Sequence, residues 1–378
     1  MIKYKNKLIV VGAFPPSSSC ISGGVVASSK IFYNPQLTDH YDLIYIDSTQ
    51  ISNPPPSIFC RLLLAFKRFV YFCFVYLTVR PDAVLIFASA GFSLMEKCFM
   101  SKLARVRSIP VLLFPRAGRV IESFHSSRIC QLLINAGLRT PTHFLCQGPS
   151  WQRFAIENLG FDQIKAPIIY NWTATNELLR IGSSRSFPSI SRVPCLLFLG
   201  WMIREKGIFD LLQVCLILTR YHNFRLIFAG GGRDEDQAKS FVKFHRLDNV
   251  IEFKGWVYGD HKNELLKSAD ILVLPSWQEG FPNCVIEAMA AKLSVIVTSV
   301  GSVPELIQDR QQALVIPPKD LRSLERAIDF LIVNPHFSVE LAERGYSFAR
   351  ENFSTNHGVF RLIEVIDSAI SDTSRPKY

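Results

Sequence analysis

Short apolar runs that alternate with helix-length segments dominate this chain. The runs in the first half are KLIVVG, YDLIYID, DAVLIFAS and PVLLFP, and those in the second half are CLLFLG, FRLIFAG, VIEFKG, DILVLPS and SVIVTS. Apolar runs of this length, with few polar interruptions, are typical of parallel strands whose two faces are both covered. Their alternation with helical segments predicts an α/β fold of two doubly wound parallel-sheet domains.

The segment at 180–194, RIGSSRSFPSISRVP, separates the two blocks of strands. It is rich in Ser, Gly and Pro and has no hydrophobic periodicity, so it is typical of a linker. We therefore expect a first domain at 1–180, a linker at 181–194, a second domain at 195–350 and a helical C-terminal segment at 351–378. A length of 378 residues accommodates two cores of this size.

Positive charge is concentrated in the first half of the chain. Residues 1–180 contain 19 Lys and Arg against 9 Asp and Glu, whereas residues 181–378 contain 23 of each, so the first half carries the whole net charge of +10. This asymmetry predicts an anionic partner, such as a phosphate, a membrane surface or a nucleic acid. The nine cysteines form no C-x-x-C pair. That pattern argues against a zinc site or a disulfide framework and favours reduced thiols in a cytoplasmic protein.

The most apolar segment, at 61–80, reads RLLLAFKRFVYFCFVYLTVR. It is nearly long enough to span a bilayer, but Lys67 and Arg68 would each cost about 2.5–3.5 kcal/mol at the bilayer centre. Two alternatives remain, a helix packed inside a soluble domain and a helix that lies at a membrane interface. The segment carries four cations, Arg61, Lys67, Arg68 and Arg80. Each would contribute roughly 1 kcal/mol of attraction to an anionic leaflet, so we expect reversible membrane contact here.

Residues that can bind phosphate follow two of the predicted strands. After the first strand, a loop contains Gly23 and Gly24, whose backbone N–H groups can approach an anion closely. After the strand CLLFLG come Arg204 and Lys206, two cations that can hold a diphosphate. Ligands of open α/β sheets bind beyond the carboxyl ends of the strands, so both loops are candidates. Taken alone, each is equally compatible with a flexible loop or a solvated surface.

The segment at 270–292, DILVLPSWQEGFPNCVIEAMAAK, carries the most specific pattern. A buried strand leads into a loop that contains Glu279, and a helix beginning near Pro282 carries Glu287. The N–H groups of the first helical turn can bind a phosphate or sugar hydroxyls. A carboxylate on such a helix can accept hydrogen bonds from both ribose hydroxyls, as acidic residues do in other nucleotide sites.

Several segments together resemble retaining glycosyltransferase family 4, also called glycosyl transferase group 1. They are FLGWMIREKGIFDLL, FKGWVYG followed by LLKSADILVLPSWQEGFPNCVIEAMA, and SVIVTSVGSVPELI followed by ALVIPPKD, in this order over about 196–330. Glu279 and Glu287, with seven residues between them, resemble the E-x7-E motif of that family. The first half is similar more loosely, through Gly23-Gly24 and through IIYNW at 168–172.

The resemblance implies the GT-B fold, in which two facing Rossmann-like domains hold a nucleotide-sugar donor in the cleft between them. It also implies that the last helix, at about 355–370, crosses back onto the first domain. Carried over by position, the catalytic residues are Arg204, Lys206 and Glu279, and the donor-binding residues are Gly23, Gly24, Val257, Gly280, Phe281, Pro282, Asn283 and Glu287. In these roles the two cations neutralise the departing diphosphate, Glu287 holds the ribose, and Glu279 with the following backbone holds the donor sugar.

Two features need separate interpretation. Many relatives have a His after the fourth strand of the first domain, whereas this chain reads FPRAGRVIESF, so we assign the acceptor side to Arg116 and Gly118. Asp234 and Asp236 match a D-x-D pattern that binds a metal-diphosphate in another glycosyltransferase fold. Because the acids stand at the start of a helical segment, they are explained by the helix dipole, and we expect neither a metal nor another cofactor.

These observations predict a cytoplasmic retaining glycosyltransferase that is peripheral on the inner face of the plasma membrane. It would move a sugar from a nucleotide-diphosphate sugar to a hydroxyl of a bacterial surface glycan or lipid-linked oligosaccharide, of the O-antigen, lipopolysaccharide or exopolysaccharide type. Two alternatives stay open, a GT-B module that binds a sugar nucleotide without transfer and a protein that binds an anionic polymer. No nucleic-acid motif is present, so we expect no nucleic-acid partner.

Overall fold

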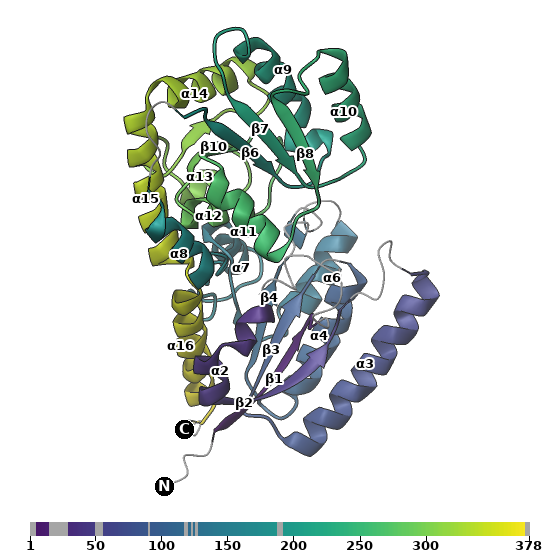
Figure 1. Ribbon diagram of the computed structural model, residues 1–378. Helices are drawn as coiled ribbons and strands as arrows, with labels where there is room; N and C mark the ends of the chain where they lie inside the picture. Colours follow the sequence, from purple (N-terminus) through teal and green to yellow (C-terminus); the bar gives the residue numbers. More distant parts are fainter. Residues whose placement is uncertain are drawn as a thin grey trace. The chain divides into compact units, whose positions relative to one another are not determined.

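Figure 1 shows the computed structural model of the chain, which describes residues 5–14, 29–49, 56–89, 91–116, 120–121, 124, 128–186 and 192–374. The chain divides into two compact units. The first unit comprises Met1–Trp172 and Asn356–Tyr378, and the second comprises Thr173–Thr355. Each unit has its own parallel sheet, which confirms the predicted fold class of two α/β domains.

In the described part of the first unit, five parallel strands have the order β2-β1-β3-β4-β5. The strands are β1 (Asn6–Gly12), β2 (Tyr41–Asp47), β3 (Ala83–Ala88), β4 (Val111–Pro115) and β5 (His143–Phe144). The helices are η1 (Lys30–Tyr33), α2 (Pro35–His40), α3 (Ile58–Val79), α4 (Phe92–Arg105), α6 (Arg128–Leu138), α7 (Pro149–Glu157) and α16 (Thr355–Ser374).

The strands of this sheet are apolar at nearly every position because both faces of the sheet are covered. Successive side chains of a strand point to opposite faces. Ile9 and Val11 of β1 belong to a cluster that includes Phe72 of α3, whereas Leu8 and Val10 belong to a second cluster on the other face. All four β1 side chains are buried. This packing explains why the predicted strands read as continuous apolar runs rather than as alternating ones.

The last helix, α16, packs on the first unit although it follows the whole second unit in the sequence. Leu362 and Ile366 lie in the same apolar cluster as Leu8 and Val10. The Tyr41 hydroxyl donates a hydrogen bond to Asp367 Oδ1 at 2.7 Å, and α16 lies beside α2 in Figure 1. The chain therefore completes the first core with its own C-terminal segment.

In the described part of the second unit, six parallel strands have the order β11-β10-β9-β6-β7-β8. The strands are β6 (Cys195–Leu199), β7 (Arg225–Ala229), β8 (Ile251–Gly255), β9 (Ile271–Leu274), β10 (Ser294–Thr298) and β11 (Leu314–Ile316). The helices are α8 (Asn176–Ser184), η2 (Arg204–Lys206), α9 (Ile208–Leu218), α10 (Glu235–Phe244), α11 (Gly259–Ser268), α12 (Asn283–Ala290), α13 (Val303–Leu306), α14 (Leu321–Val333) and α15 (Pro335–Phe353). The chain runs outward from β6 through β7 to β8 and from β9 through β10 to β11, so the order reverses between β6 and β9.

The expected linker at 181–194 begins inside a helix. Helix α8 ends at Ser184, and its N-cap residue Thr175 accepts a hydrogen bond from Leu178 N. Leu178 and Gly182 are buried, and a Cβ at Gly182 would collide with Ala290 O of α12. This close packing places α8 in the second unit, so the boundary between the units falls at Trp172/Thr173 rather than at residue 180.

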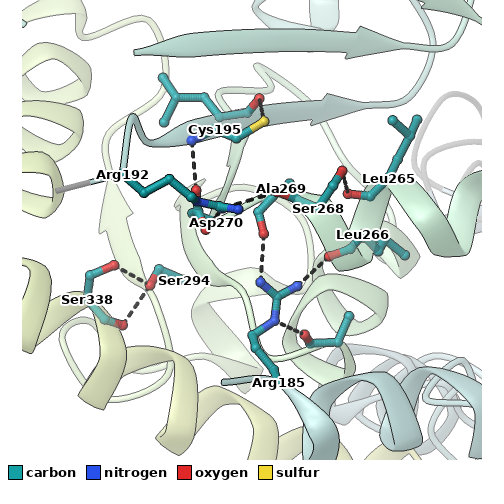
Figure 2. Close-up of polar contacts among 12 residues, drawn as sticks. Arg185, Arg192, Cys195, Leu265, Leu266, Ser268, Ala269, Asp270, Ser294 and Ser338 are labelled. Atoms are coloured by element: carbon teal, nitrogen blue, oxygen red, sulfur yellow. Dashed lines mark hydrogen bonds and ion pairs between the residues drawn. The ribbon is translucent and has the colours of Figure 1, made fainter. Parts of the chain in front are cut away.

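After α8, two arginines fasten the chain to the second unit (Figure 2). The Arg185 guanidinium donates to three carbonyl oxygens, Leu266 O at 2.6 Å, Ala269 O at 2.8 Å and Ala291 O at 2.9 Å. These carbonyls lie at the C-terminal ends of α11 and α12, where carbonyl groups lack partners within the helix. The Arg192 guanidinium pairs with Asp270, whose second oxygen accepts a hydrogen bond from Cys195 N at the start of β6.

Helix α3 exposes most of its apolar surface. It is the one helix in the described part of the chain that is long and apolar enough, by length and composition, to cross a membrane. Only Phe72, Val75 and Tyr76 are buried in it. The exposed apolar residues of the helix are Ile58, Phe59, Leu62, Leu63, Phe66, Val70, Tyr71, Phe74 and Leu77. Of the two expected alternatives, packing inside a soluble domain therefore holds only for the side of α3 that carries Phe72, Val75 and Tyr76.

The inner edge of α3 carries a buried ion pair with α4. Arg68 donates to Glu96 Oε1 through Nε at 2.5 Å and to Glu96 Oε2 through Nη2 at 2.9 Å. Glu96 and its neighbour Lys97 are both buried, and Lys97 Nζ donates to Ser93 Oγ at 2.7 Å. The prediction that all four cations of this segment face a leaflet is therefore wrong for Arg68, which turns inward to Glu96.

We predict that Lys97→Met removes a pH dependence of stability. Burial lowers the pKa of the Lys97 ammonium to about 8. The nearby Glu96 opposes this shift, and Arg68 adds to it. Between about pH 8 and the ordinary lysine pKa of 10.5, the unfolded chain still carries this proton, whereas the folded chain has lost it. The free energy of unfolding therefore rises with pH over this range. Over that window, urea unfolding should show wild type gaining on the order of 2 kcal/mol relative to the variant. If the free energies of unfolding of wild type and variant changed with pH in parallel, Lys97 would not lose its proton in the folded chain over this range.

Candidate functional site

Two loops meet at the point where the strand order of the second unit reverses. The loop after β6 contains η2, and the loop after β9 begins at Pro275. Trp277 N donates to Glu205 O at 2.8 Å, which joins the two loops through their backbones. Gly207 has a φ of 70°, and a Cβ there would collide with Pro275 O. The loops can therefore approach this closely only with Gly at 207, and they do so where ligands bind in doubly wound sheets.

Lys206 and Glu279 form an ion pair between these loops. Lys206 Nζ lies 2.6 Å from Glu279 Oε1, and the Ser276 hydroxyl donates to the same oxygen at 2.7 Å. The Glu279 side chain is 8% exposed and that of Lys206 is 21% exposed. A pair this far from solvent gains strength from the low local dielectric, but its two charges have lost most of their hydration. The site thus holds a cation and an anion that compensate each other's charge away from solvent.

The loop from Glu279 to the start of α12 is held in place by the loop after β10. Ser302 N donates to Gly280 O at 3.1 Å, and a Cβ at Gly301 would collide with Glu279 O. Helix α12 then begins at Asn283 with Pro282 as its N-cap residue, which has no side-chain group to cap it. The backbone N–H groups of this first turn carry the positive end of the helix dipole.

Glu287 lies one turn further along α12 and pairs with Lys262 of α11. The Lys262 Nζ to Glu287 Oε1 distance is 2.8 Å, and the Glu287 side chain is 16% exposed. Cys284 lies near both Glu279 and Glu287, and burial first, then these carboxylates, raise the pKa of its thiol to about 12. The structure therefore brings the two carboxylates of the predicted motif to one end of α12, each paired with a lysine.

Exposed aromatic rings lie at the carboxyl ends of β6 and β8. The Trp201 and Trp256 rings contact each other edge to face with centroids 4.7 Å apart, and Tyr258 stacks on Trp256 at 6.3 Å. All three are more than 40% exposed, and Val257 lies half-buried between two of them. Exposed aromatic faces of this kind can stack on a nucleotide base.

Arg204 is placed differently from Lys206. Its guanidinium lies over the Phe209 ring at 5.3 Å and is exposed, while its backbone N–H donates to Asp234 Oδ2 at 2.7 Å. Asp234 is the N-cap residue of α10, and Glu235 and Asp236 occupy its first turn. The acidic triplet therefore serves a loop contact and a helix start. In the described part of the chain no group of three His, Cys, Asp or Glu could hold a metal ion.

Of the residues expected in the first unit, Arg116 is described, whereas Gly23, Gly24 and Gly118 lie outside the described residues. Arg116 follows β4, and its guanidinium lies over the Phe114 ring at 4.7 Å and over the Trp172 ring at 5.5 Å. Burial lowers its pKa to about 9. Its Nη1 is buried and has no hydrogen-bond partner among the described residues. A buried guanidinium with an unmet donor is suited to a polar or anionic ligand.

Several residues of the site were not predicted from the sequence, among them Trp201, Tyr258, Lys262 and Ser276. Lys262 is 25 positions from its partner Glu287, and no local pattern distinguishes it from Lys267 of the same helix. Ser276 was identified only as the end of a strand, although its hydroxyl binds the motif carboxylate three residues later. Both contacts depend on how loops and helices fold back on the sheet.

Comparison with known proteins finds a family model that matches the second half of the chain. Residues 183–348 match the family model described as glycosyl transferases group 1. The match covers most of the second unit and agrees with the resemblance to that family found in the sequence.

Curated relatives match up to about half of the chain. The putative teichuronic acid biosynthesis glycosyltransferase TuaC of Bacillus subtilis is 33% identical over 156 residues, which are 41% of this chain and 37% of that protein. The N,N'-diacetylbacillosaminyl-diphospho-undecaprenol alpha-1,3-N-acetylgalactosaminyltransferase of Campylobacter jejuni is 26% identical over 184 residues, 49% of this chain and 47% of that protein. The chain thus matches about half or less of the length of these relatives.

Solved structures match nearly the whole chain. Sucrose-phosphate synthase from Thermosynechococcus elongatus has a TM-score of 0.75 at 14% identity, covering 97% of this chain and 100% of that one. Anabaena HepE in complex with UDP and glucose has a TM-score of 0.68 at 16% identity, covering 96% of this chain and 100% of that one. These likenesses show that the fold is GT-B, as predicted.

We predict that Lys206 and Glu279 are energetically coupled. Lys206→Met alone leaves a nearly buried carboxylate without its cation, and Glu279→Gln alone leaves a half-buried ammonium without its anion. The sum of the two single losses in the free energy of unfolding should therefore exceed the loss in the double variant. A double-mutant cycle read by urea unfolding should give a coupling energy of about 1–2 kcal/mol. The pair of Lys239 with Glu235, whose side chains are 50% and 23% exposed, is the more solvated control and should couple more weakly. Equal coupling energies for the two pairs would contradict this account.

Proposed function

We propose that this chain is a retaining glycosyltransferase that moves a sugar from a nucleotide-diphosphate sugar to a hydroxyl of a lipid-linked bacterial surface glycan. The observation that carries the donor assignment is the Lys206–Glu279 pair beside Glu287 at the reversal of strand order. The UDP and glucose bound to the Anabaena neighbour support a nucleotide-sugar donor. The Campylobacter relative, whose name refers to a diphospho-undecaprenol, supports a lipid-linked acceptor.

In the proposed donor complex, Lys206 Nζ pairs with the diphosphate in place of Glu279. The ammonium then faces the leaving group, and the released Glu279 carboxylate accepts hydrogen bonds from hydroxyls of the donor sugar. The backbone from Gly280 to Asn283 lies at the uncapped start of α12 and offers N–H groups to the same sugar or phosphate. Arg204, whose guanidinium is exposed beside the loop, is the second cation proposed for the diphosphate.

The nucleoside lies further along the site in this proposal. Glu287 accepts hydrogen bonds from the ribose hydroxyls, and Lys262 holds that carboxylate in its ionised form and in place. Trp256 and Val257 flank the base, and the exposed Trp201 ring closes the same aromatic group. In the first unit, we assign the acceptor side to Arg116, with Gly118 beside it in the sequence.

The reaction is a substitution at the anomeric carbon. The bond from that carbon to the diphosphate oxygen breaks, and the bond to the acceptor oxygen forms on the same face, so the configuration is retained. The acceptor proton passes to the departing phosphate oxygen. Negative charge grows on the diphosphate in the transition state, and Lys206 stabilises that charge in a partly dehydrated site. We propose that these cations do this work without a metal.

We predict that Glu287→Ala abolishes nucleotide release from the productive donor while leaving the fold intact. The variant loses an ion pair, but it leaves behind the ammonium of Lys262, which is 27% exposed and can be hydrated, so the chain should still fold, whereas the ribose loses its acceptor. The measurement is release of free nucleotide from UDP-, GDP- and ADP-sugars with a polyprenyl-diphosphate glycan acceptor, beginning with UDP-sugars. Glu264→Ala, on the exposed side of α11, is the matched control and should keep wild-type activity.

A folded Glu287→Ala variant with near-normal turnover would show that the motif is assigned wrongly. Activity that vanishes with EDTA and returns with Mn²⁺ would contradict a metal-free mechanism and would revive Asp234 and Asp236 as ligands. Nucleotide binding without turnover for any donor would favour the non-catalytic module. Salt-sensitive binding of nucleic acid would favour the anionic-polymer binder.

We further propose that the exposed face of α3 attaches the chain to the inner face of the plasma membrane. Nine apolar side chains of this helix are exposed, and Met95 and Phe99 of α4 extend the same kind of surface. Exposed apolar surface of this extent on a helix is typical of interfacial attachment. Lys67 and Arg80, both exposed, supply attraction to anionic lipid.

We predict that Phe59→Gln with Phe66→Gln greatly reduces co-sedimentation with liposomes that contain anionic lipid. Both rings are largely exposed, so the fold should survive their loss while the buried area at the interface falls. Phe244→Gln removes an equally exposed ring from α10 of the second unit and should change nothing. Recovery of the wild type in the supernatant with both anionic and neutral liposomes would contradict membrane attachment.

A further inference from the structure

A cavity of about 700 Å³ lies between α3 and α4 in the first unit. This volume falls within the roughly 300–1,000 Å³ that is typical of ligand pockets. Much of its wall is apolar and comes from Leu62, Ala65, Phe66, Phe69, Met95 and Phe99. The proposed donor site does not use this cavity, since its lining residues come from α3, α4 and the residues that precede α3 or follow β2 and β3.

One end of the cavity is polar. Ser48 and Thr49 follow β2, Ser89 follows β3, and Ser93 lies in the first turn of α4. These hydroxyls therefore gather at the carboxyl edge of the sheet, where open α/β sheets bind ligands. The N-cap residue of α4 is Gly91, which offers no side chain to cap the helix. The hydroxyls of Ser48 and Thr49 donate to Gly12 O and to Asp47, whereas the Ser93 hydroxyl accepts from Lys97 and keeps its own proton to donate. The Ser93 hydroxyl and the N–H groups at the start of α4 are therefore the donors that suit an anionic oxygen.

Charge at the cavity is predominantly positive. Arg61 and Arg68 line it, and Glu96 is the one acidic residue among its described lining. Both oxygens of Glu96 are engaged by Arg68, at 2.5 and 2.9 Å, and Lys97 lies 3.9 Å from the same carboxylate. Removing such a pair from water costs hydration free energy. The two hydrogen bonds to Glu96 hold the Arg68 guanidinium at the wall of the cavity. Because Glu96 neutralises Arg68, the described lining carries a net charge of one, contributed by Arg61, beside its apolar walls.

The cavity also opens onto the exposed face of α3. Leu62, Phe66, Met95 and Phe99 line the cavity and are each about half exposed or more. A hydrocarbon chain that leaves a bilayer against this face could enter the cavity while staying in contact with apolar side chains. Its polar end would then meet the hydroxyls and the arginines.

We propose that this cavity binds a single hydrocarbon chain that ends in a phosphate, namely the lipid end of the acceptor. The proposal rests on the proposed function only for the identity of the acceptor. The apolar walls bind the chain, and Arg61, Arg68 and the start of α4 bind the phosphate. Binding here holds the acceptor by its lipid, so that the sugar end is free to vary.

The test is equilibrium binding of three soluble probes, farnesyl phosphate, dodecyl phosphate and farnesol, below their micelle concentrations, with inorganic phosphate as a fourth arm. We expect either lipid phosphate to bind about tenfold more tightly than farnesol, because a charge-assisted contact is worth that much. Inorganic phosphate should not compete. Preference for farnesyl over dodecyl phosphate identifies a prenyl carrier, and the reverse identifies an acyl lipid; both support the proposal.

Two variants on α3 separate the cavity from the outer face. Ala65→Trp fills the cavity and should weaken binding of the lipid phosphate at least about tenfold. Leu63→Trp places the same ring on the exposed face, outside the lining, and should leave binding unchanged. Arg61→Gln should remove the preference for the phosphate over the alcohol. Equal binding by wild type and a folded Ala65→Trp variant would overturn the proposal.

A second measurement needs no variant. A photoreactive diazirine analogue of dodecyl phosphate should label peptides of α3 and α4 in the wild-type chain, and labelling confined to other segments would overturn the proposal even if Ala65→Trp failed to fold. Nucleotide release from the donor, measured in parallel, keeps the two hypotheses apart. A chain that releases nucleotide but binds no lipid phosphate refutes the cavity alone. A chain that binds lipid phosphate in the cavity without using any donor refutes the transferase alone.

Discussion

The ion pair between Lys206 and Glu279 is the interaction on which the proposed donor site depends. Both charges are largely removed from solvent, and a pair in such surroundings adds little to stability compared with apolar side chains of the same shape. The pair lies between the loops after β6 and β9, where the strand order reverses. Ligands of doubly wound sheets bind at this point, so we interpret the pair as serving ligand binding rather than stability. We interpret the carboxylate as holding the ammonium in position until a diphosphate competes for it, with Ser276 stabilising the carboxylate throughout.

The surrounding structure fixes this pair and its neighbour by backbone contacts. Gly207 and Gly301 let the loops pass at distances that no side chain would tolerate. Arg185 binds the C-terminal ends of both α11 and α12, the two helices that carry Lys262 and Glu287 (Figure 2). One guanidinium therefore sets the relative position of a second ion pair that lies a few turns away. Rigid support of this kind lets charged groups keep their geometry without a ligand.

Much of the fold could be predicted from the sequence, because strands covered on both faces read as continuous apolar runs, as Leu8 to Val11 show. Glu279 and Glu287 could also be predicted, since they stand in one loop and one helix within a single segment. Partners distant in the sequence could not. Lys262 and Glu287 come together only when α11 and α12 both pack against α8, and Arg68 turns to Glu96 28 positions away. The linker prediction differed at α8 because a Ser- and Gly-containing stretch is helical when Gly182 packs directly on α12.

The most direct test of the account is a crystal structure of the chain with UDP, GDP or ADP bound in the presence of EDTA. The account predicts that one of these nucleotides binds with its diphosphate within hydrogen-bond distance of Lys206 Nζ, with the Lys206–Glu279 pair opened. It also predicts that the ribose hydroxyls donate to Glu287 and that the base lies against Trp256. A nucleotide bound elsewhere, or one that binds here only through an added metal while the Lys206–Glu279 pair stays closed, would contradict it.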